Sequence, residues 1–221
     1  MLDAGYISGL RQCRRREKVI EDLESASLQE RFEHLLALIS STRFLSKQGL
    51  GNEVPFFICP FKVSETVEMQ KMQARLENRL SQQGVGVLSI NLYDLCLDIL
   101  KENGDWEWLI HTEKTHPKDE LLKDMQSMLD VETIVIPEIA RRMEMKSFDV
   151  LFLSGVGEVF PYIRSHNVLN NLQRIATDQP TVLFFPGEFR YSLEMGASLN
   201  LFGKLQDYKY YRAFNIYHCE V

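Results

Sequence analysis

Short runs of apolar residues alternate with longer amphipathic segments along most of this chain. Four compact runs, each rich in strand-forming residues and bounded by turn residues, predict strands at 54–59, 85–93, 149–153 and 181–185. The alternating segment 211–217 predicts a fifth strand. Between these runs, apolar residues recur every three or four positions, which predicts helices at 28–44, 67–80, 95–100, 106–110 and 120–145, and one more that ends at Ala176.

The order of these segments predicts an α/β fold, because helices that alternate with strands pack against both faces of a parallel sheet. We expect three layers around a mostly parallel five-stranded sheet, Rossmann-like or degenerate P-loop-like, with an N-terminal helical segment. The polar, glycine-containing stretch 188–210 is expected to be irregular with short helices. The domain boundaries predicted are a basic N-terminal extension over residues 1–25 and a single α/β domain over residues 26–221.

Composition and charge narrow the class of protein. The chain has 221 residues, of which 45% are hydrophobic, and this suffices for one sizeable core. Its net charge of -6 argues against a nucleic-acid-binding protein that contacts phosphates over its whole surface. A local basic cluster, Arg14-Arg15-Arg16 with Lys18, fits a DNA-binding arm, a targeting segment or a solvated helix face, and we favour the last.

Cysteine spacing and hydropathy bear on the compartment. Four cysteines lie far apart, without a CxxC pair or a secretory leader: Cys13, Cys59, Cys96 and Cys219. This spacing favours buried, reduced thiols over disulfides or zinc ligands. Charged residues interrupt every apolar segment before it reaches the roughly 18 residues that a membrane span needs. We therefore expect a cytoplasmic protein without a membrane span.

One stretch, residues 148–172, concentrates the features of a functional site. An apolar strand, 149–153, leads directly into two glycines, which allow a sharp turn or a close approach at the carboxyl end of a strand. Polar side chains then follow at high density. The residues predicted to recognise a partner or a ligand are Ser154, Gly155, Gly157, Glu158, Tyr162, Arg164, His166 and Asn167.

The sequence motifs of phosphate binding and nucleophilic catalysis are incomplete in this chain. The segment after the first strand, 59–62, lacks the glycines of a Walker motif, so Lys62 fits a solvated lysine better than a phosphate ligand. The dinucleotide-binding pattern fails at Phe160, where a third glycine belongs. No serine lies in a GxSxG elbow, which makes a serine hydrolase an unfavoured interpretation.

Individual polar side chains leave two interpretations each. His166 with Glu158 and Ser165 could form an acid–base group, but a histidine at a helix start is more often a capping or hydrogen-bonding residue. Arg164 suits an anion or the carboxylate of a partner, or else an internal salt bridge with Glu158 or Glu188. We predict no catalytic residue, no metal site and no cofactor.

Several segments taken together resemble one family: LGNEVPFFICP (50–60), INLYD (90–94), residues 154–172, FFPGE (184–188), GASLNLFG (196–203) and YYRAFN (210–215). They are similar to the BrxB family, a small component of BREX bacteriophage-exclusion systems, and the resemblance covers residues 28–221. It implies a cytoplasmic bacterial or archaeal protein that is needed alongside a PglZ-type phosphatase-fold protein, a BrxC-type ATPase and a PglX-type adenine methyltransferase. The family has no established catalytic residues to carry over.

Three functional hypotheses follow. The first is a non-catalytic assembly or adaptor subunit of a BREX defence complex, which holds the PglZ-type partner through the 158–171 surface and the 188–212 segment. The alternative is a degenerate nucleotide-binding regulator of the same system, with Gly155, Gly157 and Lys62 near the ligand. Direct DNA contact through the basic N-terminal cluster ranks last. The sequence leaves open whether the protein forms a homodimer.

Overall fold

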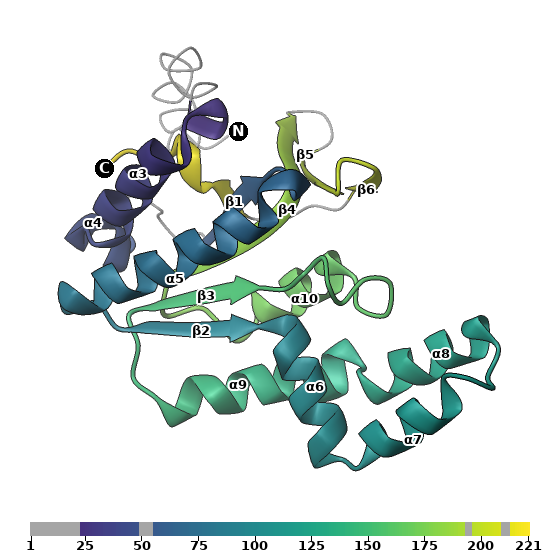
Figure 1. Cartoon of the computed structure of the whole chain (residues 1–221). Helices are drawn as coiled ribbons and strands as arrows, with labels where there is room; N and C mark the ends of the chain where they lie inside the picture. The colour runs from purple at the N-terminus through teal and green to yellow at the C-terminus, as the bar shows by residue number, and fades with distance from the viewer. Residues whose placement is uncertain (1–22, 49–54, 193–195, 209–212) are drawn as a thin grey trace, which may run out of the picture.

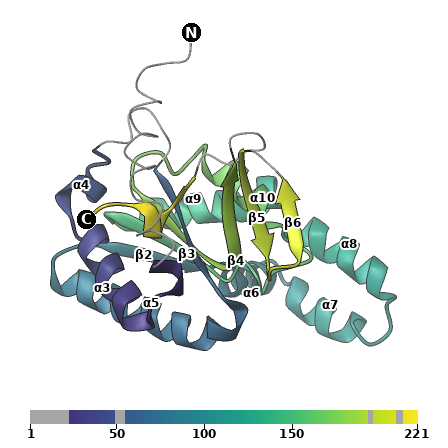
Figure 2. The ribbon, with the colours of Figure 1, turned by 90° about the horizontal axis from the view of Figure 1, so that it is seen from above.

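A computed structural model describes residues 23–48, 55–192, 196–208 and 213–221 of the chain. In these residues a central, mostly parallel sheet lies between helices that cover both of its faces (Figures 1 and 2). The basic cluster at residues 14–18, and with it most of the predicted N-terminal extension, lies outside the described residues.

Five strands pair in parallel to form the main part of the sheet. Their spatial order is β2 (Val87–Asn91), β3 (Val150–Ser154), β4 (Thr181–Ser192), β1 (Phe56–Phe61) and β7 (Phe214–Asn215). The longest parallel pairing joins β1 to β4, from Phe56 opposite Thr181 to Phe61 opposite Pro186. The predicted α/β class with a mostly parallel sheet is therefore confirmed.

The central strands are buried on both faces. All six residues of β1 and the first four residues of β3 are buried. Successive side chains of a strand point to opposite faces, and they enter two separate cores: Phe56 and Ile58 belong to one, Phe57 and Cys59 to the other. A strand that is apolar at every position requires cover on both sides, which explains the three layers.

Helices from different parts of the chain supply that cover. One face carries α3 (Leu28–Ile39), α4 (Thr42–Leu45) and α5 (Thr66–Gln82). The other face carries α6 (Leu92–Glu102), the π-helical segment Val131–Val135, α9 (Ile136–Met145) and α10 (Ser165–Leu172). Two helices without a buried residue, α7 (Asp105–Thr112) and α8 (Lys118–Met128), project from the body as a hairpin (Figure 2).

Capping side chains explain where two of these helices begin. Ser27 and Glu30 form a reciprocal capping box at the start of α3. At α6 the cap is Asn91, whose side-chain oxygen accepts hydrogen bonds from the backbone N–H groups of Tyr93 (2.8 Å) and Asp94 (3.3 Å). The strand predicted over 85–93 consequently ends at Asn91, and α6 begins directly after it.

The prediction of an irregular segment with short helices over 188–210 is wrong. β4 continues to Ser192, β5 (Gly196–Leu201) returns antiparallel beside it, and β6 (Leu205–Tyr208) pairs with β5. These strands raise the sheet to seven. Antiparallel strands need apolar residues on one face only, and in β5 these are Leu199 and Leu201. The other residues of such strands can be polar, which is also typical of a loop and explains the wrong prediction.

The helical segment predicted over 120–145, in which Pro137 starts a new helix or a kink, is divided into α8, the π-helical segment and α9. α8 ends at Met128, and the next segment is capped by Asp130, whose side chain accepts a hydrogen bond from the Thr133 N–H at 2.8 Å. Pro137 then lies in the first turn of α9, where its missing N–H is tolerated. None of the described helices is long and apolar enough to cross a membrane.

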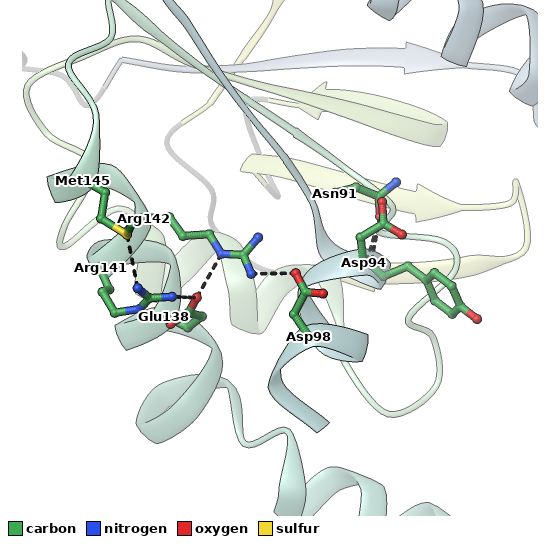
Figure 3. Close-up of polar contacts among 8 residues, drawn as sticks. Asn91, Asp94, Asp98, Glu138, Arg141, Arg142 and Met145 are labelled. Atoms are coloured by element: carbon green, nitrogen blue, oxygen red, sulfur yellow. Dashed lines mark hydrogen bonds and ion pairs between the residues drawn. The ribbon is translucent and has the colours of Figure 1, made fainter. Parts of the chain in front are cut away.

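A group of ion pairs connects α9 to α6 (Figure 3). Arg142 donates hydrogen bonds to Asp98 at 2.8 Å and to Glu138 at 2.9 Å, so it bridges the two helices. Arg141 donates two more hydrogen bonds to Glu138, at 2.6 and 2.7 Å. These hydrogen bonds, first of all the one from Arg141, lower the pKa of the Glu138 carboxyl.

We expect Glu138→Gln to lower the free energy of unfolding by about 1 kcal/mol at pH 7, the upper range for a surface ion pair, because Glu138 is largely covered but Arg141 and Arg142 are accessible to water. The pKa of Glu138 is lower in the folded state than in the unfolded state. The ionised carboxylate therefore stabilises the fold at pH values above its unfolded-state pKa, and this stabilisation is lost as the pH falls through the lower, folded-state pKa. Urea unfolding of the wild type and the variant at several pH values should show the difference shrinking in acid. Glu144→Gln, an exposed change on the same helix, is the control. A difference that does not depend on pH would contradict the assignment.

Candidate functional site

A cavity of about 160 Å³ opens near the carboxyl ends of the parallel strands. Its walls come from the ends of β1 to β4, the first two turns of α5, the loop after β3 and the turn between β5 and β6. The lining residues are Phe61, Thr66, Met69, Gln70, Gln73, Asn91, Ser154, Gly155, Val156, Gly157, Glu158, Phe184, Pro186 and Phe202.

The path of the chain explains why a cavity lies here. After β1 the chain crosses to the face covered by α5, whereas after β3 it crosses to the face covered by α10. The two connections diverge, and β4 lies between their strands. Such a switch point leaves a crevice outside the carboxyl ends of the strands, where α/β proteins bind ligands.

Gly155 lets the loop after β3 pass close to the start of α6. Its φ is +78°, a left-handed conformation that favours glycine. A Cβ atom at this position would lie 3.0 Å from the Leu92 backbone nitrogen and would collide with the side-chain oxygen of Asn91. Since that oxygen caps α6, a side chain at position 155 would displace the cap as well as strain the backbone.

Gly157 plays a corresponding part on the opposite wall. A Cβ atom there would lie 2.8 Å from the ring of Phe202 and 3.0 Å from the ring of Pro186. Phe202 also packs edge-on against Phe160, with ring centroids 6.4 Å apart. The two glycines thus hold the loop between the α6 start and an aromatic wall.

Amide and hydroxyl groups supply most of the polar lining. Gln73, which is 9% exposed, donates to Glu77 at 2.9 Å and to Ser89 at 3.1 Å, so its amide nitrogen is occupied. Gln70 donates to the Glu158 carboxylate at 3.4 Å, which links α5 to the loop after β3. Among the described lining residues, Glu158 alone is ionisable, and it is exposed at the mouth.

The structure divides the predicted recognition residues into two groups. Ser154, Gly155, Gly157 and Glu158 line the cavity, whereas Tyr162, Arg164, His166 and Asn167 lie farther along the chain and do not. Lys62, which the nucleotide hypothesis placed near a ligand, is exposed and also does not line the cavity.

The second group has structural surroundings of its own. The hydroxyl of Tyr162 donates to the backbone carbonyl of Glu158 at 3.3 Å, and burial raises the pKa of Tyr162 to about 12. His166 is buried in α10, and Asn167 accepts a hydrogen bond on its carbonyl from the Asn171 amide at 2.9 Å. Arg164 is exposed and has no ion-pair partner in the described part of the chain.

Only four of the fourteen lining residues, Ser154, Gly155, Gly157 and Glu158, belong to the predicted recognition set. Gln70, Gln73 and Thr66 lie on a helix whose polar residues resembled a solvated face, and Phe202 lies in the segment predicted to be irregular. Asn91 was placed inside a strand. Its one local signal was a capping residue directly before the apolar run of α6.

Two cysteines are buried, as their spacing predicted. Burial raises the pKa of both Cys59 and Cys96 to about 12, so each thiol is protonated near neutral pH and is a poor nucleophile. Within the described residues, no group of three or more His, Cys, Asp or Glu side chains is arranged to hold a metal ion.

The fold and the cavity define a doubly wound α/β protein with a small, mostly uncharged cavity at the switch point of its sheet. The family model described as BREX protein BrxB matches residues 88–216, which include Asn91, the loop after β3 and Phe202. The chain therefore belongs to the BrxB family, and as a BREX component it has a place in phage defence.

Two curated relatives carry the same description, BREX protein BrxB. The protein of Bacillus cereus (strain H3081.97) is 34% identical over 196 residues, which cover 86% of this chain and 97% of the relative. The protein of Escherichia coli O9:H4 (strain HS) is 25% identical over 189 residues, covering 86% of this chain and 91% of the relative. No solved structure matches the chain significantly.

A side chain at position 155 would destabilise the fold in two ways, by straining the left-handed backbone and by colliding with Asn91. A matched pair of alanine variants measures these two effects separately. Gly84 has a φ of +81° with no atom within 4 Å of an added Cβ, so Gly84→Ala reports the left-handed backbone alone, about 1–2 kcal/mol. We expect Gly155→Ala to lower the free energy of unfolding by about 1–2 kcal/mol more, because it also displaces the Asn91 cap. Urea unfolding measures both changes. Equal losses would contradict the role assigned to Gly155.

Proposed function

We propose that this chain is a non-catalytic assembly subunit of a BREX phage-defence complex, and that it holds a PglZ-type partner at the carboxyl edge of its sheet. The distribution of exposed apolar side chains carries the proposal. Of the eight large apolar side chains exposed in the described part of the chain, four lie just beyond the carboxyl ends of parallel strands or in the adjoining β6 strand: Val63, Val67, Tyr93 and Leu205. We call this surface, with Glu158 and Arg164, the docking edge.

The composition of the docking edge supports a protein partner. Val63 and Val67 are 47% and 55% exposed, and burying them would remove apolar area from water. Glu158 is exposed and accepts a hydrogen bond from Gln70, which lies on α5 as Val67 does, and Arg164 is exposed at the start of α10. An apolar centre with a charged rim is the usual arrangement of a protein interface, and an arginine that pairs with no described carboxylate suits a carboxylate of the partner.

The chemistry of the cavity supports a binding role over a catalytic one. Its polar lining is made of amides and hydroxyls apart from the Glu158 carboxylate, and outside the cavity burial raises the pKa values of Cys59, Cys96 and Tyr162 to about 12. Apart from that carboxylate, these groups hold their protons at neutral pH, so they suit hydrogen bonding better than proton transfer. The choice of a PglZ-type partner comes from the family context, and BrxC-type and PglX-type proteins are the competing partners in the tests below.

We expect Val67→Asp to abolish co-purification of the PglZ-type protein from cells that express the whole system, and to weaken phage resistance in parallel. Val67 is exposed in the first turn of α5, where an acidic residue is tolerated, so the fold should persist. Met145→Asp is the matched control, because Met145 is 71% exposed on α9 near the opposite end of the sheet. Retention of the partner by the Val67 variant, or capture of only the BrxC-type or PglX-type protein by the wild type, would refute the proposal.

Charge reversal tests the rim separately. Arg164→Glu should weaken the complex about 5-fold, and more at low salt, because the reversed rim charge replaces attraction to a partner carboxylate with repulsion and slows association. Arg79→Glu makes the same change in charge at the far end of α5 and should leave the complex intact. The measurement is the dissociation constant of the purified pair at physiological salt. Equal affinities for the wild type and the Arg164 variant would remove Arg164 from the interface.

A further inference from the structure

The hydrogen-bond network around the cavity leaves particular donors and acceptors unused. The Asn91 oxygen is occupied by two backbone N–H groups of α6, which fixes the orientation of the amide. Within the described parts of the chain its Nδ2 group has no acceptor and can donate to a ligand, and Figure 3 shows the amide nitrogen on the side away from α6.

The glutamines present the opposite polarity. Both N–H groups of Gln73 are taken by Glu77 and Ser89, and one of the two of Gln70 is taken by Glu158. No donor among the described residues pairs with either carbonyl oxygen, so both oxygens can accept a hydrogen bond. The hydroxyl of Ser154 can serve as either. A ligand that satisfies this wall carries an acceptor for Asn91 and a donor for a glutamine.

The remaining walls are apolar and partly aromatic. Phe61, Phe184 and Phe202 contribute rings, and Met69 and Pro186 complete the apolar surface. Flat rings with amide-like edges fit such surroundings, because proteins read nucleobases by stacking on aromatic side chains and by hydrogen bonds from Asn and Gln.

Size and charge narrow the class of ligand further. The cavity of about 160 Å³ is close to the engineered cavity of about 150 Å³ that accepts benzene, so it has room for one six-membered ring. In the described lining no lysine or arginine is present to neutralise a phosphate, and the Glu158 carboxylate stands at the mouth. A neutral ring is therefore favoured over a phosphorylated one.

We propose that this cavity is a binding site for a neutral pyrimidine ring, as in a free pyrimidine nucleoside or in an unstacked base of a single strand. The ring lies among the aromatic side chains, its carbonyl accepts from Asn91 Nδ2, and its N–H or amino group donates to a glutamine carbonyl. The proposal does not rest on the proposed docking edge, although Glu158, α5 and the loop after β3 contribute to both.

The test uses the full chain with uridine, cytidine and thymidine as probes, and isothermal titration or chemical shifts as the readout. We expect saturable binding that is at least about 10-fold tighter for a pyrimidine nucleoside than for adenosine, and tighter for the nucleoside than for its 5′-monophosphate. Oligo(dT) or oligo(dC) against oligo(dA) distinguishes a base on a strand from a free nucleoside. Absence of saturable binding to every pyrimidine probe, or equal affinity for adenosine, would overturn the proposal.

Asn91→Asp supplies the decisive variant. Aspartate caps a helix as well as asparagine, so α6 is preserved, but the donor is replaced by a charged acceptor. We expect at least a 10-fold loss of pyrimidine affinity, with thermal unfolding and partner co-purification unchanged. Asn103→Asp, the same change at the far end of α6, should bind as the wild type does. Undiminished affinity in the Asn91 variant would place any ligand outside this cavity.

Discussion

The structure depends on the burial of its central strands on both faces. β1 and β3 offer apolar side chains to each side, and neither strand is stable in water until two layers of helices cover them. The chain meets this requirement by sending the connection after β1 to one face and the connections after β2 and β3 to the other. The divergence of these connections creates the crevice at the carboxyl edge, so the position of the site is a consequence of how the core is covered.

Backbone geometry then decides what the crevice can hold. Gly155 and Gly157 bring the loop after β3 against the capped start of α6 and the ring of Phe202. The cap commits the oxygen of Asn91 and leaves its nitrogen unpaired among the described residues, while Gln70 donates to Glu158 and Gln73 donates to Glu77 and Ser89. Structural hydrogen bonds thereby set the polarity of the cavity wall.

Membership of the BrxB family gives this geometry its biological setting. The docking edge and the cavity share the first turns of α5 and the loop after β3, so a ligand in the cavity would lie beside any partner at the edge. If the two interact, each must change the affinity of the other by the same factor. An assembly subunit built in this way would bind its partner with an affinity that depends on whether the cavity is occupied.

The sequence by itself determined the layers and the part of the site that directly follows β3. Runs of apolar residues revealed the strands because continuous burial leaves a continuous pattern, and the glycines after β3 marked the loop that forms one wall. Only the tertiary structure decided the rest. Gln70 and Gln73 resembled a solvated helix face, Asn91 resembled a strand residue, and β5 and β6 resembled a loop. Local patterns report whether a side chain is buried, but a cavity is defined by which distant segments meet, and the loop after β3 meets Asn91 and Phe202 only once the whole sheet has formed.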